Sequence, residues 1–558
     1  MVRHGTFAGL AMAAATLAPM VASAEAPNPI SPAALSQTVK VLSSDPFQGR
    51  APGTPGEKKT VAYLIARFKA LGLKPGGVAG SWTQPVPLVR AQVTGTPKVV
   101  VNGGGQATPL AQLQDIYVST VRPTDRVTID KAPLVFVGYG VKAPERQWDD
   151  FKGVDLKGKV AVFLVNDPDF EAQPGEPVAG RFGGKAMTYY GRWTYKYEEA
   201  ARQGAVGALI VHETPGAGYG WSTVVAPQGE TYDIRRPASG PQPVLLQGWL
   251  QRDAAVALFR KAGLDFEALK AKARQADFHP VALGDQTFSA DFAVTHSAIE
   301  SHNVLAKLPG TTRPDQTIMY GAHWDAYGLG APDAHGDRIR HGANDDGLGV
   351  AGVLEIAHAF KAAPPPTRTV VFAIWTAEER GLLGSETYAV HPIYPFAKTV
   401  ANLTMDILET AGPARDVVLV GAGQDSLEGE LRAAAAGQGR TVTSDPHPEK
   451  GLFYRADHFS LAKRGVPTLL LMAISGGPDL VSGGRAAGDK WVDDYTANCY
   501  HKACDAWSAD WDLRGAAQDV ELLYDIGRQL AASDAWPQWN DGSEFKVVRA
   551  ASQGARKP

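Results

Sequence analysis

The sequence predicts an α/β protein in which a mostly parallel sheet is sandwiched by helices and a smaller β-rich domain is inserted. From about Ser301 onward, short apolar runs alternate with helical stretches at the spacing of βαβ units. From about Ile116 to about Ala282, short strand-like runs are instead separated by Gly and Pro clusters. The length of 558 residues also exceeds one ordinary domain of about 100–200 residues.

The first predicted element is a helix within residues 31–72. Val61, Leu64, Ile65 and Phe68 recur there at helical spacing, and Gly72 ends the pattern. In the middle region we expect strands at 134–137, 160–165 and 208–211 and a helix at 195–203. In the last region we expect buried strands at 318–320, 370–375, 403–405, 417–420 and 468–472, with helices at 349–361, 427–436 and 456–463.

These changes in the pattern of apolar, Gly and Pro residues predict five segments along the chain. They are a signal peptide (1–24), the N-terminal part of the main domain (25–115), an inserted domain (116–285), the main domain itself (286–545) and a flexible tail (546–558).

The first residues have the features of an export signal. Arg3 and His4 precede an apolar stretch at 7–21, and Ala22-Ser23-Ala24 places small residues where signal peptidase cleaves. A short membrane anchor is the alternative, but this stretch is shorter than the ~20 apolar residues that span a bilayer. We therefore expect cleavage after Ala24 and a mature protein, without a membrane span, in the periplasm or outside the cell.

The charge balance argues against a nucleic-acid partner. The formal net charge is −3, from 55 basic and 58 acidic residues. Proteins that bind nucleic acid neutralise its phosphates with clustered Lys and Arg, and this chain has no such excess.

The chain has two cysteines, Cys499 and Cys504, which are close in sequence. In an exported protein this spacing favours one local disulfide, with a pair of free thiols as the alternative. Tyr500 and His501 lie between them.

Polar residues follow the predicted strands of the last region where each strand ends. His323 and Asp325 follow the first strand, Glu378 and Glu379 follow the second, and Asp406 follows the third. In open α/β sheets the carboxyl ends of the strands form the ligand site. We therefore expect these side chains to meet at one edge of the sheet.

Each of these residues also has an ordinary structural explanation. Asn344, Asp345 and Asp346 open a predicted helix, where carboxylates commonly cap the exposed N–H groups. The pair of glutamates suits a solvated first helical turn, and single histidines are usually hydrogen-bonded parts of the structure. The nearest competitors as ligands are His302, His341 and His458.

The combination of residue types favours a metal site over these separate explanations. Zinc takes His nitrogen and Asp or Glu oxygen, and a catalytic site leaves one position for water. Three carboxylates and one hydroxide would balance two zinc ions, while two neutral imidazoles complete the coordination without adding charge. Asp325, two residues after His323, is placed to orient its imidazole.

The motifs together resemble the di-zinc exopeptidases, namely the bacterial zinc aminopeptidases related to glutamate carboxypeptidase and the transferrin receptor. The motifs are GAHWD (321–325), GANDD (342–346), EE (378–379), MD (405–406) and CYHKAC (499–504), together with PFQGR (46–50) and YRADH (454–458). Their order along the chain makes the resemblance specific, and it spans nearly all of the expected mature protein.

The resemblance implies a role for each matching residue. Asp345 would bridge two zinc ions, with His323 and Asp406 completing one site and Glu379 and His501 the other. Cobalt or manganese could replace zinc.

The remaining implied roles concern the chemistry. Glu378 would be the general base, acting on a metal-bridging water that is the nucleophile. Tyr500 would hydrogen-bond the oxyanion, with a packed aromatic ring as the alternative. Arg455 would contact substrate, unless it forms an ion pair with Asp457.

The middle region is similar to the protease-associated (PA) domain inserted in several such peptidases. The similar segments are GVDLKGKV (153–160) and AARQGA (200–205). No cluster of metal ligands occurs there, so we expect a lid or a wall that restricts substrates.

The resemblance therefore implies an aminopeptidase that acts on peptides. A carboxypeptidase needs several arginines to hold a carboxylate, and the motifs show no such cluster. This type of carboxypeptidase remains an alternative, as do a one-zinc glutaminyl cyclase and a catalytically silent binding protein. The complete set of ligands and Glu378 argues against the last two.

Overall fold

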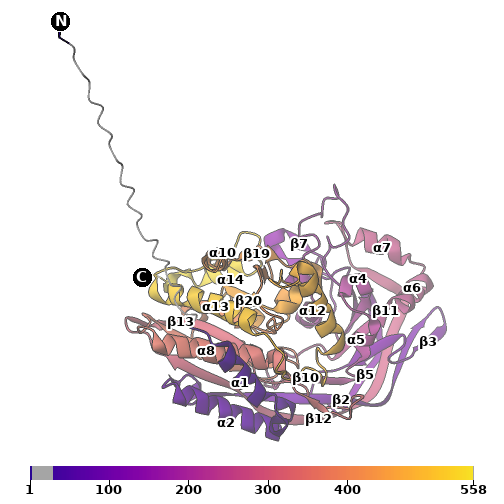
Figure 1. Cartoon of the computed structure of the whole chain (residues 1–558). Coiled ribbons are helices and arrows are strands. Elements are labelled where there is room, and N and C mark those ends of the chain that lie inside the picture. The colour runs from indigo at the N-terminus through magenta and orange to yellow at the C-terminus, as the bar shows by residue number, and fades with distance from the viewer. Residues whose placement is uncertain (3–28, 557–558) are drawn as a thin grey trace.

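The computed structural model describes residues 1–2 and 29–556. The predicted signal peptide, apart from its first two residues, lies outside the described residues. The two largest hydrophobic cores of the described residues lie along one sheet, which runs through both of them (Figure 1).

Within the described residues this sheet has fourteen strands, ten of which form its main path. In spatial order these ten are β20 (Thr468–Leu471), β17 (Thr399–Met405), β13 (Arg313–His323), β16 (Arg368–Trp375), β12 (Val281–Leu308), β5 (Arg126–Phe136), β8 (Val160–Leu164), β9 (Gly207–His212), β11 (Leu246–Gln251) and β4 (Ile116–Ser119).

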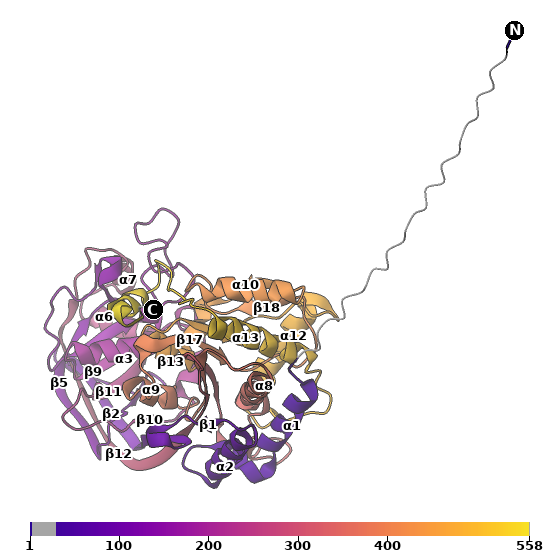
Figure 2. The same cartoon turned by 90° about the vertical axis from the view of Figure 1, so that its left-hand side faces the viewer.

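The first four strands are parallel to one another and buried on both faces. On one face, Ile318 and Tyr320 of β13 pack in the core that includes α8 (Gly349–Ala362) and α13 (Arg514–Ala532). On the other face, Met319 packs with residues of α9 (Leu383–Val390) and α11 (His458–Ala462). Helices therefore cover both faces of this part of the sheet, as predicted (Figure 2).

The middle region forms a second parallel run, β5, β8, β9 and β11, around the second core. The long strand β12 joins the two runs, pairing antiparallel with β16 near its end and with β5 near its start. It also pairs along most of its length with β2 (Thr83–Gly103). The two parallel runs are therefore parts of one continuous sheet.

The long strands β2 and β12 do not appear among the predicted elements. Their side chains alternate irregularly between buried and exposed, so neither has the short apolar run that marks a buried strand. β12 crosses the predicted boundary at residue 285, and residues 91–110 contribute side chains to the second core. The domain boundaries therefore stay a prediction.

One predicted strand of the main sheet lies elsewhere. Residues 417–420 overlap β18 (Asp416–Leu419), which pairs in parallel with β19 (Thr441–Ser444) in a separate two-stranded sheet. The apolar pattern identifies a buried strand but carries no information about its partner.

The segment predicted as a flexible tail is helical where it is described. α14 (Lys546–Ala551) holds the buried Arg549, whose guanidinium donates to the backbone oxygens of Phe396 and Thr399 at 3.2 and 3.0 Å. These bonds to a distant loop order the segment.

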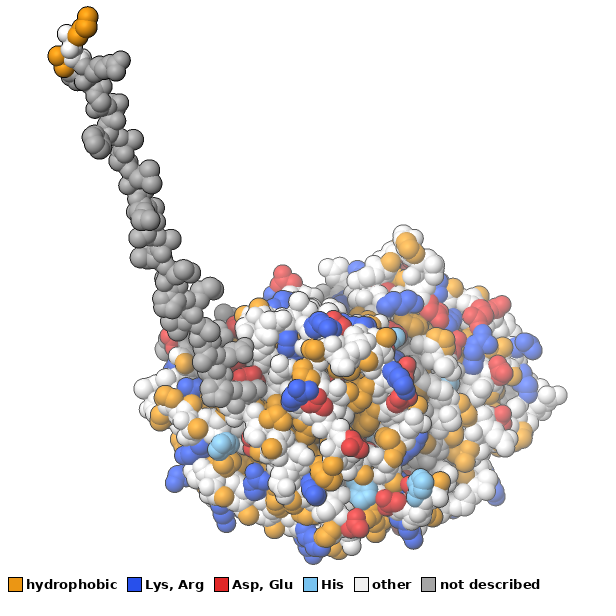
Figure 3. Space-filling model, in the orientation of Figure 1, with side chains coloured by type: hydrophobic (Ala, Val, Ile, Leu, Met, Phe, Trp, Pro, Cys, Tyr) orange, Lys and Arg blue, Asp and Glu red, His pale blue; other side chains and the backbone are white. Residues whose placement is uncertain are grey.

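No helix of the described residues has the length and apolar character needed to cross a membrane. On the face drawn in Figure 3, basic and acidic side chains are interspersed.

Candidate metal centre

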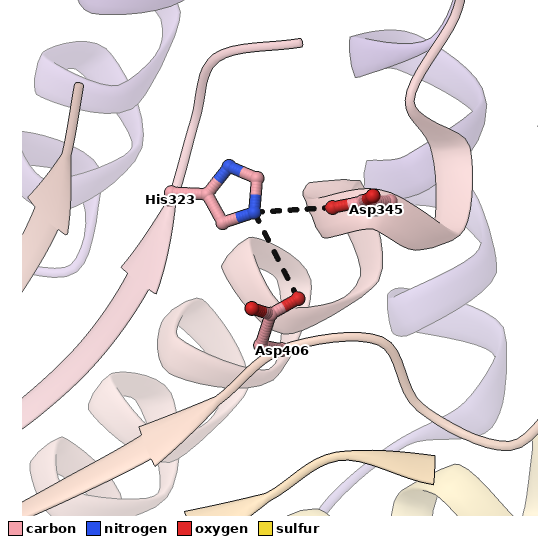
Figure 4. A group of neighbouring side chains, drawn as sticks. All are labelled: His323, Asp345 and Asp406. Atoms are coloured by element: carbon pink, nitrogen blue, oxygen red, sulfur yellow. Dashed lines mark ion pairs between the residues drawn. The ribbon is translucent and has the colours of Figure 1, made fainter. Parts of the chain in front are cut away.

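Three of the predicted ligands meet at the carboxyl end of the main sheet (Figure 4). His323 ends β13, Asp406 directly follows β17, and Asp345 lies in the turn before α8. The His323 Nε2 atom is 3.1 Å from Asp345 Oδ1 and 3.8 Å from Asp406 Oδ1. All three ligand atoms lie within 4.8 Å of one another.

The other two predicted ligands form a second group around the same aspartate. His501 Nε2 is 3.3 Å from Asp345 Oδ2 and 3.3 Å from Glu379 Oε2. Each carboxylate oxygen of Asp345 therefore faces a different histidine. The structure thus brings all five predicted ligands together in two groups that share Asp345.

The register of parallel strands explains this convergence. His323 pairs with Trp375, so β13 and β16 end together and the turn after β16 carries Glu378 and Glu379 to the same edge. Helix capping, the alternative explanation for Asp345 and Asp346, applies to Asp346. Its Oδ1 accepts from the Gly349 N–H at 2.9 Å and its Oδ2 from the His323 N–H at 3.1 Å.

The residues fit metal ions. His323, Asp345 and Asp406 are at most 4% exposed. His323 Nε2 and Asp406 Oδ1 are buried without a hydrogen-bond partner in the described residues. Buried polar atoms are almost always paired, so unpaired atoms that converge on one point indicate a ligand. The donor set of imidazole nitrogens and carboxylate oxygens is the one that zinc prefers.

The electrostatics of the site agree with a place for cations. Burial raises the pKa of Glu379 well above its usual value, and the nearby carboxylate of Asp345 adds to the effect. Burial also raises the pKa of Asp406. For His323 burial acts in the opposite sense, but surrounding carboxylates, Glu378 first, outweigh it and raise its pKa well above the ordinary value. Crowded acidic groups of this kind are stabilised by positive charge.

Glu378 lies beside the ligands but belongs to neither group. Its Oε2 is 3.8 Å from His323 Nε2, and its side chain is 10% exposed. Burial raises its pKa well above the usual value, and the carboxylates of Asp406 and Glu379 contribute. Its position beside both ligand groups, without belonging to either, suits general acid–base chemistry.

Asp325 contacts both His323 and Glu378. Its backbone oxygen is 3.1 Å from His323 Nδ1, and its carboxylate Oδ1 is 3.7 Å from the same atom. The same Oδ1 accepts from the Glu378 N–H at 3.1 Å. The backbone carbonyl therefore makes the closer contact with the imidazole, while the carboxylate fixes the turn that carries Glu378.

Tyr500 and the disulfide lie beside His501. Cys499 and Cys504 are bonded, as expected from their spacing. The Tyr500 ring lies against the His501 imidazole, with centroids 3.6 Å apart. In the part of the chain that is described, the Tyr500 hydroxyl has no hydrogen-bond partner. It is therefore free to meet a ligand.

The competing histidines are held by other parts of the structure. His302 Nδ1 is 3.1 Å from Glu57 Oε1, and His341 Nδ1 is 2.6 Å from the Ser43 backbone oxygen. His458 is fully buried against the Phe453 ring, with centroids 4.8 Å apart. None of the three belongs to either ligand group.

Two buried residues whose roles the sequence did not reveal hold the ligand loops. Asp505, directly after the disulfide, accepts from the Asn344 and Asp345 N–H groups at 2.9 and 3.0 Å. Arg50, at the end of PFQGR, donates to four backbone oxygens. These are Trp324 at 2.6 Å, Leu42 at 2.9 Å, His341 at 2.7 Å and Gly342 at 2.6 Å. The PFQGR motif could be identified in the sequence, but the carbonyl groups that Arg50 contacts lie up to 292 residues away.

Arg50→Lys should lower the thermal unfolding midpoint of the main domain by about 5–10 °C. Lysine has fewer N–H donors than arginine, so it leaves buried carbonyls unpaired, and each lowers the free energy of unfolding by about 1–3 kcal/mol. A loss of about 1 kcal/mol corresponds to a drop of roughly 2–4 °C in the unfolding midpoint of a domain of this size. Differential scanning calorimetry would measure the midpoint. Arg126→Lys, at an exposed ion pair with Asp291, is the matched control and should change little. An unchanged midpoint in Arg50→Lys would contradict this role.

Two arginines that are far apart in the sequence, Arg192 and Arg455, lie close enough for the charge of Arg455 to lower the pKa of Arg192. Arg192, directly before α3 (Trp193–Arg202), is 8% exposed, and its Nε atom has no partner in the described residues. Burial lowers the pKa of Arg192 to about 10, and the nearby charge of Arg455 contributes. Arg455 lies close enough to Tyr500 and Glu378 for both to raise its pKa, against the effect of burial. Within the described residues no ion pair joins Arg455 to Asp457.

Comparisons with known proteins agree with the resemblance seen in the motifs. Residues 303–524 match the family described as Peptidase family M28. Leupeptin-inactivating enzyme 1 of Streptomyces exfoliatus is 30% identical over 251 residues, which are 44% of this chain and 50% of that protein. Aminopeptidase NAALADL1 of Mus musculus is 33% identical over 121 residues, 20% of this chain and 15% of that protein. The chain thus spans at most half the length of these curated relatives.

Among solved structures, the aminopeptidase from Aneurinibacillus sp. strain AM-1 is 20% identical, with a TM-score of 0.47, over 90% of this chain and 94% of that one. The family match covers all the predicted ligands and Glu378. Residues 303–524 of this chain therefore resemble peptidase family M28.

Proposed function

We propose that this protein is an exported, zinc-dependent aminopeptidase that removes N-terminal residues from peptides. The observation that carries the proposal is the pair of ligand groups that share Asp345, with unpaired His323 Nε2 and Asp406 Oδ1 atoms facing the same point. The match of residues 303–524 to Peptidase family M28 supports it.

His323, Asp345 and Asp406 would hold one zinc ion, and Asp345, Glu379 and His501 the other. Bound zinc would polarise the scissile carbonyl and bring a water molecule near its ionised form at neutral pH. Glu378, beside the ligands but outside both groups, would take a proton from the attacking water and give it to the leaving amine. The free hydroxyl of Tyr500 would donate to the oxyanion.

The same centre would recognise the amino end of a peptide. Buried carboxylates surround it, and an α-ammonium group supplies the positive charge that such carboxylates favour. This feature supports an aminopeptidase over an endopeptidase, since an internal peptide bond has no charged amino end nearby.

Arg192 and Arg455 favour a second candidate, a carboxypeptidase of the glutamate carboxypeptidase type. Arg192 is buried, and its Nε atom has no hydrogen-bond partner in the described residues. A guanidinium group with an open donor is well suited to bind the carboxylate of a peptide. Such a carboxylate could belong to a C-terminus, or to a short peptide whose amino end lies at the metals.

Four versions of one short peptide would test both candidates: both ends free, the amino end acetylated, the carboxyl end amidated, and both ends blocked. An aminopeptidase cleaves the free and amidated peptides, and acetylation should reduce kcat/KM by at least about 100-fold because the ammonium contact is lost. A carboxypeptidase is stopped by amidation instead. Cleavage of the acetylated peptide at the rate of the free one would overturn the leading proposal.

We further propose that the leader is removed after Ala24, that the middle region is a PA domain, and that it forms a wall over the site. Sequencing the N-terminus of the exported protein would test the cleavage site.

A further inference from the structure

The middle region reaches the turn that carries Glu378 and Glu379. Strand β10 (Glu230–Ile234) pairs antiparallel with β2. Ile234, at its end, packs in one apolar cluster with Ala377 and Leu383, which flank that turn on either side. A part of the chain without metal ligands of its own therefore contacts the edge of the metal centre.

Arg380, the residue after the ligand Glu379, lies against two aromatic rings. Its guanidinium carbon is 4.8 Å from the centroid of the Tyr232 ring and 4.9 Å from that of the Tyr327 ring. Its side chain is 18% exposed, so both contacts are largely shielded from water. A guanidinium group over an aromatic face is stabilised by the ring quadrupole, more strongly where water is excluded.

The β10 side of this contact is fixed by further bonds. Glu230 Oε1 is 4.0 Å from the Arg380 guanidinium and accepts from the Tyr232 hydroxyl at 2.9 Å. Glu230 Oε2 accepts from Arg90 Nε of β2 at 2.9 Å. Tyr232 therefore presents its ring to Arg380 in a defined position.

On the other side, Tyr327 lies against the ligand His501. The two rings have centroids 4.6 Å apart and planes inclined by 45°. His501 is 32% exposed, whereas His323 is 1% exposed. His501 therefore has far less surrounding structure to hold its ring.

The two histidines are oriented in different ways. His323 Nδ1 lies 3.1 Å from the Asp325 backbone oxygen, the type of hydrogen bond that usually fixes a metal-binding imidazole. His501 Nδ1 has no hydrogen-bond partner in the part of the chain that the structure describes, and its ring contacts are with Tyr327 and Tyr500. Aromatic contacts thus take the place of the missing hydrogen bond.

We infer that Arg380 is a positioning residue that ties β10 of the middle region to the metal centre and holds Tyr327 against His501. The middle region then has a second role besides covering the site: it sets the orientation of one metal ligand. The inference rests on the proposed metal-binding function, and it concerns the group formed by Asp345, Glu379 and His501.

The test is a titration of the metal-depleted full chain with Co²⁺ and with Zn²⁺, followed by calorimetry and by the visible spectrum of bound cobalt. Arg380→Gln and Tyr232→Leu should weaken one of the two binding events by about 10–100-fold and leave the other unchanged, the usual effect of losing a group that orients a ligand. Both should change the cobalt spectrum, which reports ligand geometry.

Three further variants separate positioning from general damage. Arg380→Lys should restore part of the affinity because it keeps a cation over the rings. Tyr232→Phe should bind better than Tyr232→Leu because it keeps the aromatic face and loses only the hydroxyl bond to Glu230. Arg235→Gln, at an exposed ion pair with Glu300 beside the same strand, is the matched control and should equal the unmodified protein. Thermal midpoints would show that all variants are folded.

Two binding events with unchanged affinities and spectra in folded Arg380→Gln and Tyr232→Leu would overturn this inference and leave the proposed function intact. Absence of Zn²⁺ and Co²⁺ binding by the unmodified chain would instead overturn the proposed function itself.

Discussion

Glu378→Gln should lower kcat by about 10²–10⁴-fold, the usual contribution of a general acid–base group. Glutamine keeps the size of the side chain but cannot accept the proton of the attacking water. Glu378 belongs to neither ligand group, so zinc content should stay the same. The effect should appear in kcat more than in KM, because the lost contribution is to proton transfer rather than to binding.

The measurement is steady-state kinetics on the free peptide, with metal analysis of each preparation. Glu300→Gln, at an exposed position in an ion pair with Arg235, makes the same chemical change away from the site and should retain full activity. If Glu378→Gln kept normal turnover with normal zinc content, the assignment of the base would be wrong.

Asp345→Asn should have the larger effect on metal binding, because one carboxylate serves both ligand groups. Each Asp345 oxygen faces a different histidine, at 3.1 Å for His323 and 3.3 Å for His501. An amide can offer only one oxygen, and it lacks the negative charge that balances the cations. Affinity at both sites should fall by more than the roughly 10–100-fold typical of losing an orienting group, and activity should be lost with the metal.

Metal analysis and activity after dialysis against a chelator would check this prediction. The unmodified protein should contain about two zinc ions per chain and should regain activity when zinc, cobalt or manganese is added back. Asp277→Asn, a surface change in an ion pair with Lys272, is the control. A chain that never holds metal would point to the silent binding protein kept as an alternative.

The residues of the candidate metal centre could be predicted because they lie in short motifs that can be recognised in the sequence. His323, Glu379 and Asp406 lie at or shortly after the ends of buried strands and Asp345 precedes a helix, and parallel strands end at the same edge of their sheet. His501 follows a helix instead and was recognised from the CYHKAC motif. The same logic identified the α/β class and seven of the ten strands on the main path of the sheet. It could not assign β18 to its partner or detect β12, because pairing depends on contacts between distant segments.

Local patterns in the amino-acid sequence indicate which residue types lie at the edge of the sheet, because the place of a side chain at the end of a strand is a local property of the chain. Which groups surround those side chains depends on tertiary packing. Three of the four carbonyls around Arg50 and the rings on either side of Arg380 join residues far apart in the chain. Such contacts form only when separate segments pack against one another, so no pattern within any one segment records them.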